Sequence, residues 1–185
     1  MKIQINNLCK KFGDKVVFES YTNTFDFDGI LLIKGASGLG KTTLMRIIAG
    51  LEKADKGEII KNVKTISFMF QEDRLIPFVS VLKNLTAVCN EEKALHYLKL
   101  MGLESEKDNS PLSLSGGMRR RVSLARALCF NSDLVILDEP FKGLDEELKL
   151  SICEIIKEES KKRDFIIISH DSEDAKILNA RFIEI

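Results

Sequence analysis

A glycine-rich loop lies between a strand-like run and a helix-like run near the start of the chain. The run ILLIKGASGLGKTT contains the pattern G-x-x-x-x-G-K-T, from Gly35 to Thr42. In such a loop the glycines let successive backbone N–H groups turn inward, and the next helix points its positive dipole end at the same anion. A glycine-rich turn without a ligand is the alternative, and the strand–loop–helix setting argues against it. The pattern therefore predicts a phosphate-binding loop.

The chemistry of this loop assigns roles to its last residues. Lys41 is expected to reach the β and γ phosphates of a nucleotide, and the Thr42 hydroxyl is expected to ligate Mg²⁺. The loop alone identifies neither the nucleotide nor its use. The residues expected to contact the nucleotide here are Gly35, Ser37, Gly38, Leu39, Gly40, Lys41, Thr42 and Thr43.

Composition sets the limits on size and compartment. The 185 residues predict one domain, 1–185, with room for a small inserted subdomain, and 44% of them are hydrophobic. Lys plus Arg and Asp plus Glu number 28 each, so broad electrostatic capture of nucleic acid is not expected. No apolar run is long enough to span a membrane, and we expect no secretory signal because Met1 to Asn7 has no apolar core. The four cysteines, which we expect to fill core space in a reducing cytoplasm, are Cys9, Cys89, Cys129 and Cys153.

The apolar pattern changes along the chain and predicts an α/β fold. Before residue 30 apolar and polar residues alternate, as in half-buried antiparallel strands. Later the apolar runs are continuous, which is typical of parallel strands buried on both faces, and helical patterns separate them. These runs are Ile30–Ile33, Ile66–Phe70, Leu134–Leu137 and Phe165–Ile168.

Two helices have clear limits in the sequence. One is predicted over Glu146 to Ser160, where apolar residues recur at helical spacing. The other is predicted from Glu91 to Met101 and ends at Gly102, a residue suited to a left-handed cap. The segment from Gln71 to Ser115 lacks strong strand runs, so a mainly helical insertion, about 72–125, is expected within the core.

A second acidic element follows the apolar run that begins at Leu134. Asp138 and Glu139 end this run just before Pro140, and ligand sites of parallel sheets lie at the carboxyl ends of strands. Asp138 is expected to hold Mg²⁺, and Glu139 to take a proton from an attacking water. Two acids that end a strand in a turn are the alternative reading.

The run LSGGM from Leu114, followed by RRRVSLARAL, resembles the signature segment of ATP-binding cassette (ABC) ATPases. Gln71, Asp145 and His170 occur in the order of that family, so the resemblance covers nearly the whole chain. It implies a P-loop NTPase core with a mainly parallel sheet, an amino-terminal antiparallel part and a small helical subdomain.

The signature forms a second helix-start anion site, made by Ser115, Gly116 and Gly117. The family resemblance implies a head-to-tail dimer in which this segment closes over the γ phosphate held by the other subunit. Two ATP molecules would then be shared between the chains, and hydrolysis would reverse the preference for the closed state.

The resemblance also assigns roles to single residues. Phe12 is expected to stack on adenine in place of the more usual tyrosine, with a core phenylalanine as the alternative, and Val17 to touch the base or ribose. Gln71 is implied to sense Mg²⁺ and the attacking water, Asp145 to cross the dimer interface, and His170 to contact the γ phosphate.

The surface around the signature suggests partners. We expect the arginines at 119–121 to pair with acids or nucleotide across the dimer. Leu75, Ile76 and Phe78 lie in a stretch that resembles bacterial importer ATPases, and we expect them to contact a membrane subunit; packing inside the helical subdomain is the alternative. Met118 stands where glutamine is commoner in the signature, and in this the segment resembles the ATPases of nitrate, sulfonate and thiamine-precursor importers. The short carboxyl end, Arg181–Ile185, suggests a minimal cassette.

Taken together, these patterns predict a Mg-dependent ATPase that drives the membrane subunits of an ABC transporter, in import. It would be peripheral on the inner face of the cell membrane, paired with a second copy of itself or a similar subunit, with no nucleic-acid partner. The alternatives are an exporter ATPase, and a soluble ABC-type ATPase that acts as a clamp or regulator on protein or nucleic acid.

Overall fold

Two sheets and six α-helices make up the computed structural model, which describes all 185 residues. The strands are β1 (Lys2–Phe12), β2 (Lys15–Asp26), β3 (Ile30–Lys34), β4 (Lys56–Lys61), β5 (Ile66–Met69), β6 (Leu134–Asp138), β7 (Asp164–Ile168) and β8 (Arg181–Glu184). The helices are α1 (Lys41–Ile48), α2 (Val81–Thr86), α3 (Glu91–Leu100), α4 (Gly116–Cys129), α5 (Glu146–Ser160) and α6 (Glu173–Ile177).

The smaller sheet is antiparallel and has the order β2-β1-β4. Strands β1 and β2 form a hairpin whose pairing runs from Lys2 opposite Asp26 to Phe12 opposite Lys15. The alternating pattern before residue 30 predicted these two strands, and that prediction is confirmed. Strand β4, which the sequence pattern did not predict, pairs along the other edge of β1.

The larger sheet is parallel throughout and has the order β5-β6-β7-β3-β8. Each of the four continuous apolar runs forms one of its strands, β3, β5, β6 or β7, as predicted. All five residues of β6 are buried, which fits a central strand covered on both faces. Strand β8, at the edge beside β3, was not predicted.

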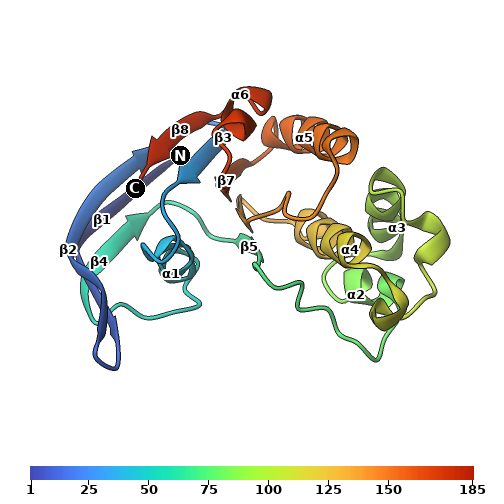
Figure 1. Cartoon of the computed structure of the whole chain (residues 1–185), viewed down its shortest axis with the longest axis horizontal. Coiled ribbons are helices and arrows are strands. Elements are labelled where there is room, and N and C mark those ends of the chain that lie inside the picture. Colours follow the sequence, from blue (N-terminus) through green and yellow to red (C-terminus); the bar gives the residue numbers. More distant parts are fainter.

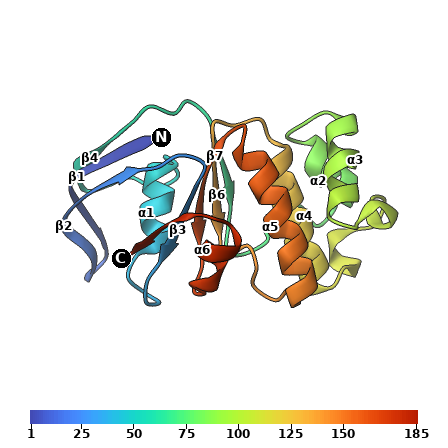
Figure 2. The same cartoon turned by 90° about the horizontal axis from the view of Figure 1, so that it is seen from above.

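The elements lie in layers. Figure 2 shows α1 between the antiparallel sheet and the parallel sheet, with α4 and α5 on the other face of the parallel sheet and α2 and α3 farther out. In Figure 1 both termini lie near the antiparallel sheet and β8, far from α2 and α3. The parallel sheet therefore separates a layer made of α1 and the antiparallel sheet from a layer made only of helices.

Each face of the parallel sheet has its own hydrophobic core. Leu31 and Ile33 of β3 point into a cluster of 16 buried residues that also includes residues of β1 and α1. Ile30 and Leu32 of the same strand point into a cluster of 27 buried residues shared with α2 to α5. This alternation within one strand is why its apolar run is continuous.

The predicted helices have the expected limits. Helix α5 covers the predicted range, Glu146–Ser160, and α3 ends at Leu100 with Gly102 just beyond it at a φ of 64°. The segment between Gln71 and Ser115 contains α2, α3 and two short 3₁₀ turns but no strand. None of the helices is both long and apolar enough to cross a bilayer.

The cysteine prediction is confirmed for two residues of four. Cys129 and Cys153 are buried in the larger core, whereas Cys9 and Cys89 are only partly buried. All four are free thiols. The core-filling expectation is wrong for Cys9, which lies on β1 and belongs to neither core cluster.

Candidate active site

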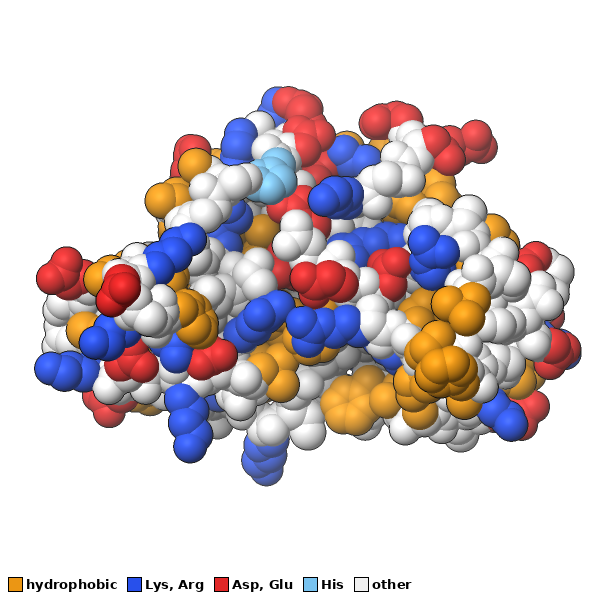
Figure 3. Space-filling view, turned by 60° about the horizontal axis from the view of Figure 1, so that its bottom comes forward, with side chains coloured by type: hydrophobic (Ala, Val, Ile, Leu, Met, Phe, Trp, Pro, Cys, Tyr) orange, Lys and Arg blue, Asp and Glu red, His pale blue; other side chains and the backbone are white.

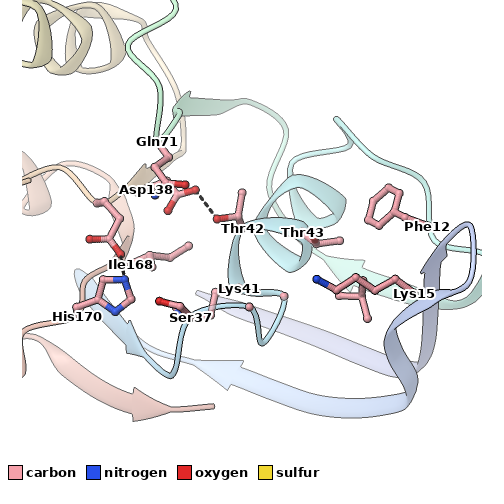
Figure 4. Close-up of a pocket in the computed structure, with 14 residues that line it drawn as sticks. Phe12, Lys15, Ser37, Lys41, Thr42, Thr43, Gln71, Asp138, Ile168 and His170 are labelled. Carbon is pink, nitrogen blue, oxygen red and sulfur yellow. Dashed lines mark hydrogen bonds and ion pairs between the residues drawn. The ribbon is translucent and has the colours of Figure 1, made fainter.

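A cavity of about 310 Å³ lies where β3, β6 and β7 end (Figure 4). This is the edge at which ligand sites of parallel sheets form. Twelve of its lining residues were predicted as site residues, and Lys15 and Ile168 were not. The lining consists of Phe12, Lys15, Val17, Ser37, Gly38, Gly40, Lys41, Thr42, Thr43, Gln71, Asp138, Glu139, Ile168 and His170.

The glycine-rich loop joins β3 to α1 and forms the floor of the cavity. The Lys41 ammonium donates hydrogen bonds to the carbonyl oxygens of Gly35, at 2.7 Å, and Ala36, at 2.9 Å. It is thus folded back onto its own loop. The first-turn N–H groups of α1 have no acceptor within the helix, so a phosphate group could accept hydrogen bonds from them and from Lys41.

Gly40 is required by both the backbone and the space around it. Its φ is 89°, in the left-handed region, and it precedes the first residue of α1. A Cβ at this position would lie 2.5 Å from Val17 Cγ1 and 2.8 Å from Phe18 Cζ. The hairpin therefore packs directly against the start of the helix, and this packing brings Val17 to the cavity.

Asp138 is the last residue of β6 and is almost fully buried. The Thr42 hydroxyl donates to its Oδ2 at 2.7 Å, which joins the start of α1 to the end of β6. Burial raises the pKa of Asp138, and the hydrogen bond from Thr42 partly opposes this shift. The two side chains predicted to share a metal ion are thus adjacent.

Glu139 and His170 face each other across the cavity mouth. His170 Nε2 lies 2.8 Å from Glu139 Oε1, and this contact brings together the ends of β6 and β7 (Figure 4). Burial raises the pKa of the Glu139 carboxyl, while the positive charge that His170 can carry opposes the shift. Glu139 has a φ of 56°, an uncommon backbone conformation for a residue with a side chain.

Gln71 lies between two cavities. It lines the cavity described above and also a neighbouring one of about 350 Å³, whose walls include Glu139, His170 and residues of α5. In the wall of this second cavity, Lys149 of α5 pairs with Asp171 and with the buried Asp174. These ion pairs join α5 to the segment that follows His170.

The far end of the cavity is made by the β1–β2 hairpin. Phe12 is 48% exposed and lies under Lys10, whose Nζ is 4.7 Å from the ring centroid. Phe12 is therefore not a core residue, which removes the alternative considered for it. Figure 4 shows Lys15 extending its amino group toward Thr43, opposite the side where Asp138 and His170 lie. Sequence reasoning missed Lys15 because a lysine beside a hairpin turn carries no pattern.

The remaining predicted residues do not line this cavity. Ser115 caps α4 by accepting a hydrogen bond from the Met118 N–H, and Asp145 caps α5 in the same way with Leu148. The two segments adjoin, because a Cβ on Gly117 would lie 3.6 Å from the Gly143 carbonyl oxygen. Six predicted residues are absent from the lining, namely Gly35, Leu39, Ser115, Gly116, Gly117 and Asp145.

The expectation that the arginines at 119–121 pair across a dimer is wrong for Arg120, which is buried in its own chain. Arg120 and Arg121 donate to backbone carbonyl groups of their own chain, and Arg121 Nη1 lies 2.6 Å from the Met101 oxygen. Arg119 bonds the Leu114 carbonyl and lies 3.8 Å from Asp73. The sequence shows the positive charges but not the carbonyl groups that the fold brings to them.

The stretch expected to meet a membrane subunit is exposed in part. Phe78 is 91% exposed and Ile76 46%, whereas Leu75 is partly buried against the larger core. Figure 3 shows hydrophobic side chains gathered over the helical part of the molecule, to the right of a charged central strip. Packing inside the helical part is thus correct for Leu75 and wrong for Phe78.

The side chains at the cavity suit magnesium only together with a ligand. Thr42, Asp138 and Gln71 offer oxygen atoms, the donors that Mg²⁺ prefers. No group of three or more His, Cys, Asp or Glu side chains could hold a metal ion in this chain. Phosphate oxygens would therefore have to complete the coordination.

The chain matches known proteins along nearly its whole length. A family profile described as ABC transporter matches residues 19–142. The aliphatic sulfonates import ATP-binding protein SsuB 1 of Rhodococcus jostii is 36% identical over 182 residues, covering 94% of this chain and 74% of that protein. The spermidine/putrescine import ATP-binding protein PotA of Pasteurella multocida is 32% identical and is matched over 98% of this chain. The chain spans 55% of the length of PotA.

Solved structures share the arrangement of elements. The dimeric structure of a post-hydrolysis state of the ATP-binding cassette MJ0796, bound to ADP and Pi, has a TM-score of 0.89 and 26% identity. The match covers 99% of this chain and 94% of that one. The predicted P-loop core, with a parallel sheet, an amino-terminal antiparallel sheet and a helical part, is confirmed.

Proposed function

The chain belongs to the ABC transporter family of ATP-binding proteins, and on this premise we propose that it binds and hydrolyses ATP to drive the membrane subunits of a transporter. One observation carries the proposal. The phosphate-binding loop, the buried Asp138 and the Glu139–His170 pair line the same cavity, so a nucleotide held by the loop would present its terminal phosphate to a carboxylate base.

The main groups of the cavity have separate tasks in this proposal. The hairpin residues Phe12 and Val17 hold the base, while the loop N–H groups and Lys41 hold the phosphates. Glu139 accepts a proton from the attacking water, and its raised pKa brings it closer to neutral pH, where a general base is most effective. His170 orients that carboxylate and faces the terminal phosphate.

Magnesium would be held by Thr42 and Asp138, with Gln71 near the attacking water. When bound with ATP it supplies positive charge that offsets the charge on the phosphate oxygens. The buried Asp138 favours this role, because a carboxylate whose pKa is raised by burial gains from a neighbouring cation.

Two chains are needed to complete the site. Ser115 and the first-turn N–H groups of α4 form an anion site that does not line the cavity of their own chain. We therefore propose a head-to-tail pair in which Ser115, Gly116, Gly117 and Asp145 of one subunit face the terminal phosphate bound by the other. The dimeric cassette structures that resemble this chain support such a pairing.

We propose that the helical part carries the coupling surface, which we define as the exposed Ile76 and Phe78 and which would contact the membrane subunits. The exposed Ile76 and Phe78 are large apolar side chains near the Gln71 segment, and such side chains on a surface mark interaction sites when they gather. Relatives named as import ATP-binding proteins favour import as the direction. We place the protein at the cytoplasmic face of the membrane, bound to its membrane subunits.

Hydrolysis is tested by Glu139→Gln, which preserves the shape of the side chain and removes the base. We expect ATP turnover to fall by about a hundredfold or more. ATP should still bind, and dimers should accumulate in gel filtration because the closed state is not released. Glu147→Gln, an exposed glutamate in the first turn of α5, is the matched control. Full turnover in Glu139→Gln would show that another group is the base.

The shared site is tested by mixing two inactive variants. Lys41→Ala removes the loop lysine, and Ser115→Arg blocks the helix start. If the sites are shared, a mixed pair has one site with an intact loop and an intact helix start, so activity reappears on mixing. If each chain closes its own site, no mixed pair is active.

Transport is tested by adding candidate membrane subunits in lipid and measuring ATP turnover. Stimulation that is lost in Phe78→Ser supports the proposed coupling surface. Stimulation by nucleic acid or by a soluble protein, with no response to membrane subunits, would favour a clamp or regulator instead.

A further inference from the structure

Arg120 joins the two segments that carry the predicted chemistry. Its side chain, on α4, is buried, and Nη1 donates to the carbonyl oxygens of Phe70 at 2.9 Å and Gln71 at 2.8 Å. Nη2 donates to the carbonyl oxygens of Asp138 and Glu139, each at 2.5 Å. One guanidinium thus bonds four backbone carbonyl groups. Two belong to neighbouring residues just beyond β5, and two to neighbouring residues at the end of β6.

The chemistry of arginine suits this position. A guanidinium is planar and always charged, and it presents its donors in a rigid fork, so its two ends can bond two separate segments at a set spacing. Asp73 Oδ1 lies 3.4 Å from Nη1 and balances part of the charge. The Nε of Arg120 has no partner, so all of its hydrogen bonds are made by Nη1 and Nη2.

The backbone held by Arg120 has an uncommon shape. Glu139 has a φ of 56°, which a residue with a side chain adopts only where its surroundings hold it. Its carbonyl oxygen accepts from Arg120, and its N–H donates to the Ile168 carbonyl at 3.0 Å. Both ends of the residue are therefore held, and the carboxylate is aimed at His170.

We propose that Arg120 is a positioning residue that sets the carboxylate of Glu139 and the backbone of Gln71 together, relative to α4. The inference rests on the proposed function, in which Glu139 is the base and Gln71 is near the attacking water. Arg120 does not touch the nucleotide cavity, so its effect passes through these two residues.

The kinetic test compares Arg120→Met and Arg120→Lys with Arg121→Met. We expect Arg120→Met to lower kcat by about 10- to 100-fold, because small displacements of a catalytic group have effects of that size. The KM for ATP should stay within about twofold, since uniform binding is untouched. Arg120→Lys should recover part of kcat, because an ammonium keeps the charge but lacks the fork. Arg121→Met, which removes a bond only to Met101, should keep kcat.

A second test does not depend on turnover. Hydrogen exchange in the nucleotide-free protein should become faster at residues 70–73 and 138–141 in Arg120→Met, and should not change there in Arg121→Met. If Glu139→Gln proves fully active, the proposed base is wrong, whereas the exchange result still decides whether Arg120 holds these segments.

Three results would overturn the inference. These are an unchanged kcat in Arg120→Met, a loss confined to ATP affinity, and equal exchange effects in the Arg120 and Arg121 variants. If Arg120→Met does not fold, Arg120→Lys carries the same comparisons, with unchanged kcat and unchanged exchange at both segments counting against the proposal.

Discussion

Removal of the Phe12 ring is expected to affect ATP affinity and folding stability to different extents. Phe12 ends β1 at the mouth of the cavity and is 48% exposed, so half of its surface is open to a ligand. Lys10 Nζ lies 4.7 Å from the ring centroid, and Phe12 itself lines the cavity. Phe12→Ala should therefore change the affinity for ATP more than the free energy of unfolding.

The two effects differ in size. Stacking of a base on an aromatic ring contributes about 1–3 kcal/mol, so ATP should bind about 5- to 150-fold more weakly to Phe12→Ala. The loss of folding stability is expected to be about 1 kcal/mol, mainly from the cation–π contact with Lys10. A buried phenylalanine would instead lose about 3–5 kcal/mol.

Affinity is measured by titration with a fluorescent ATP analogue, and stability by urea unfolding without nucleotide. Phe12→Tyr should keep the affinity, because the ring remains. Phe182→Ala is the matched control, since Phe182 is 42% exposed on β8 and does not line the cavity. If Phe12→Ala lowered the free energy of unfolding by about 3 kcal/mol or more and left ATP affinity unchanged, the reasoning would be refuted.

Two further measurements follow from the cavity. Lys15→Met should weaken ATP binding about two- to fivefold, an effect that high salt reduces, whereas Lys11→Met on the same hairpin should leave affinity unchanged because Lys11 does not line the cavity. The pH profile of kcat should show an acid limb above the ordinary glutamate value of 4.5, because burial raises the pKa of Glu139 and the base acts only when deprotonated. A limb at or below 4.5 would count against Glu139 as a buried base.

The fold was predictable where the pattern is local. The apolar runs that became β3, β5, β6 and β7 are continuous because the parallel sheet is covered on both faces, so burial is visible in the sequence. Strand β4 has the sequence KGEIIK, which is half charged, and only its pairing with β1 makes it a strand. Such pairing joins residues far apart in the chain and leaves no local pattern.

The candidate site was likewise predictable where its residues follow a local pattern, and not where their roles depend on distant parts of the chain. The glycine-rich loop, Asp138–Glu139 and His170 each lie at the end of a strand or within two residues of it, and parallel strands bring these three chain positions to one edge. Lys15 and Arg120 were not predictable, because their roles depend on which atoms lie opposite them. Arg120 bonds residues 18 to 50 positions away in the sequence.

Helix α4 would have two functions if both proposals hold, one at each of two sites. Ser115 stands at its start and Arg120 lies five residues along it, a rise of about 7–8 Å at 1.5 Å per residue. In the proposed pair, the start of α4 meets the phosphate held by the partner, while Arg120 holds the base and the Gln71 segment of its own chain. A shift of α4 when the partner's ATP binds would therefore move the carboxylate that acts on the chain's own ATP. This arrangement makes each site responsive to the nucleotide in the other, and it predicts that the two sites of a pair do not hydrolyse ATP independently.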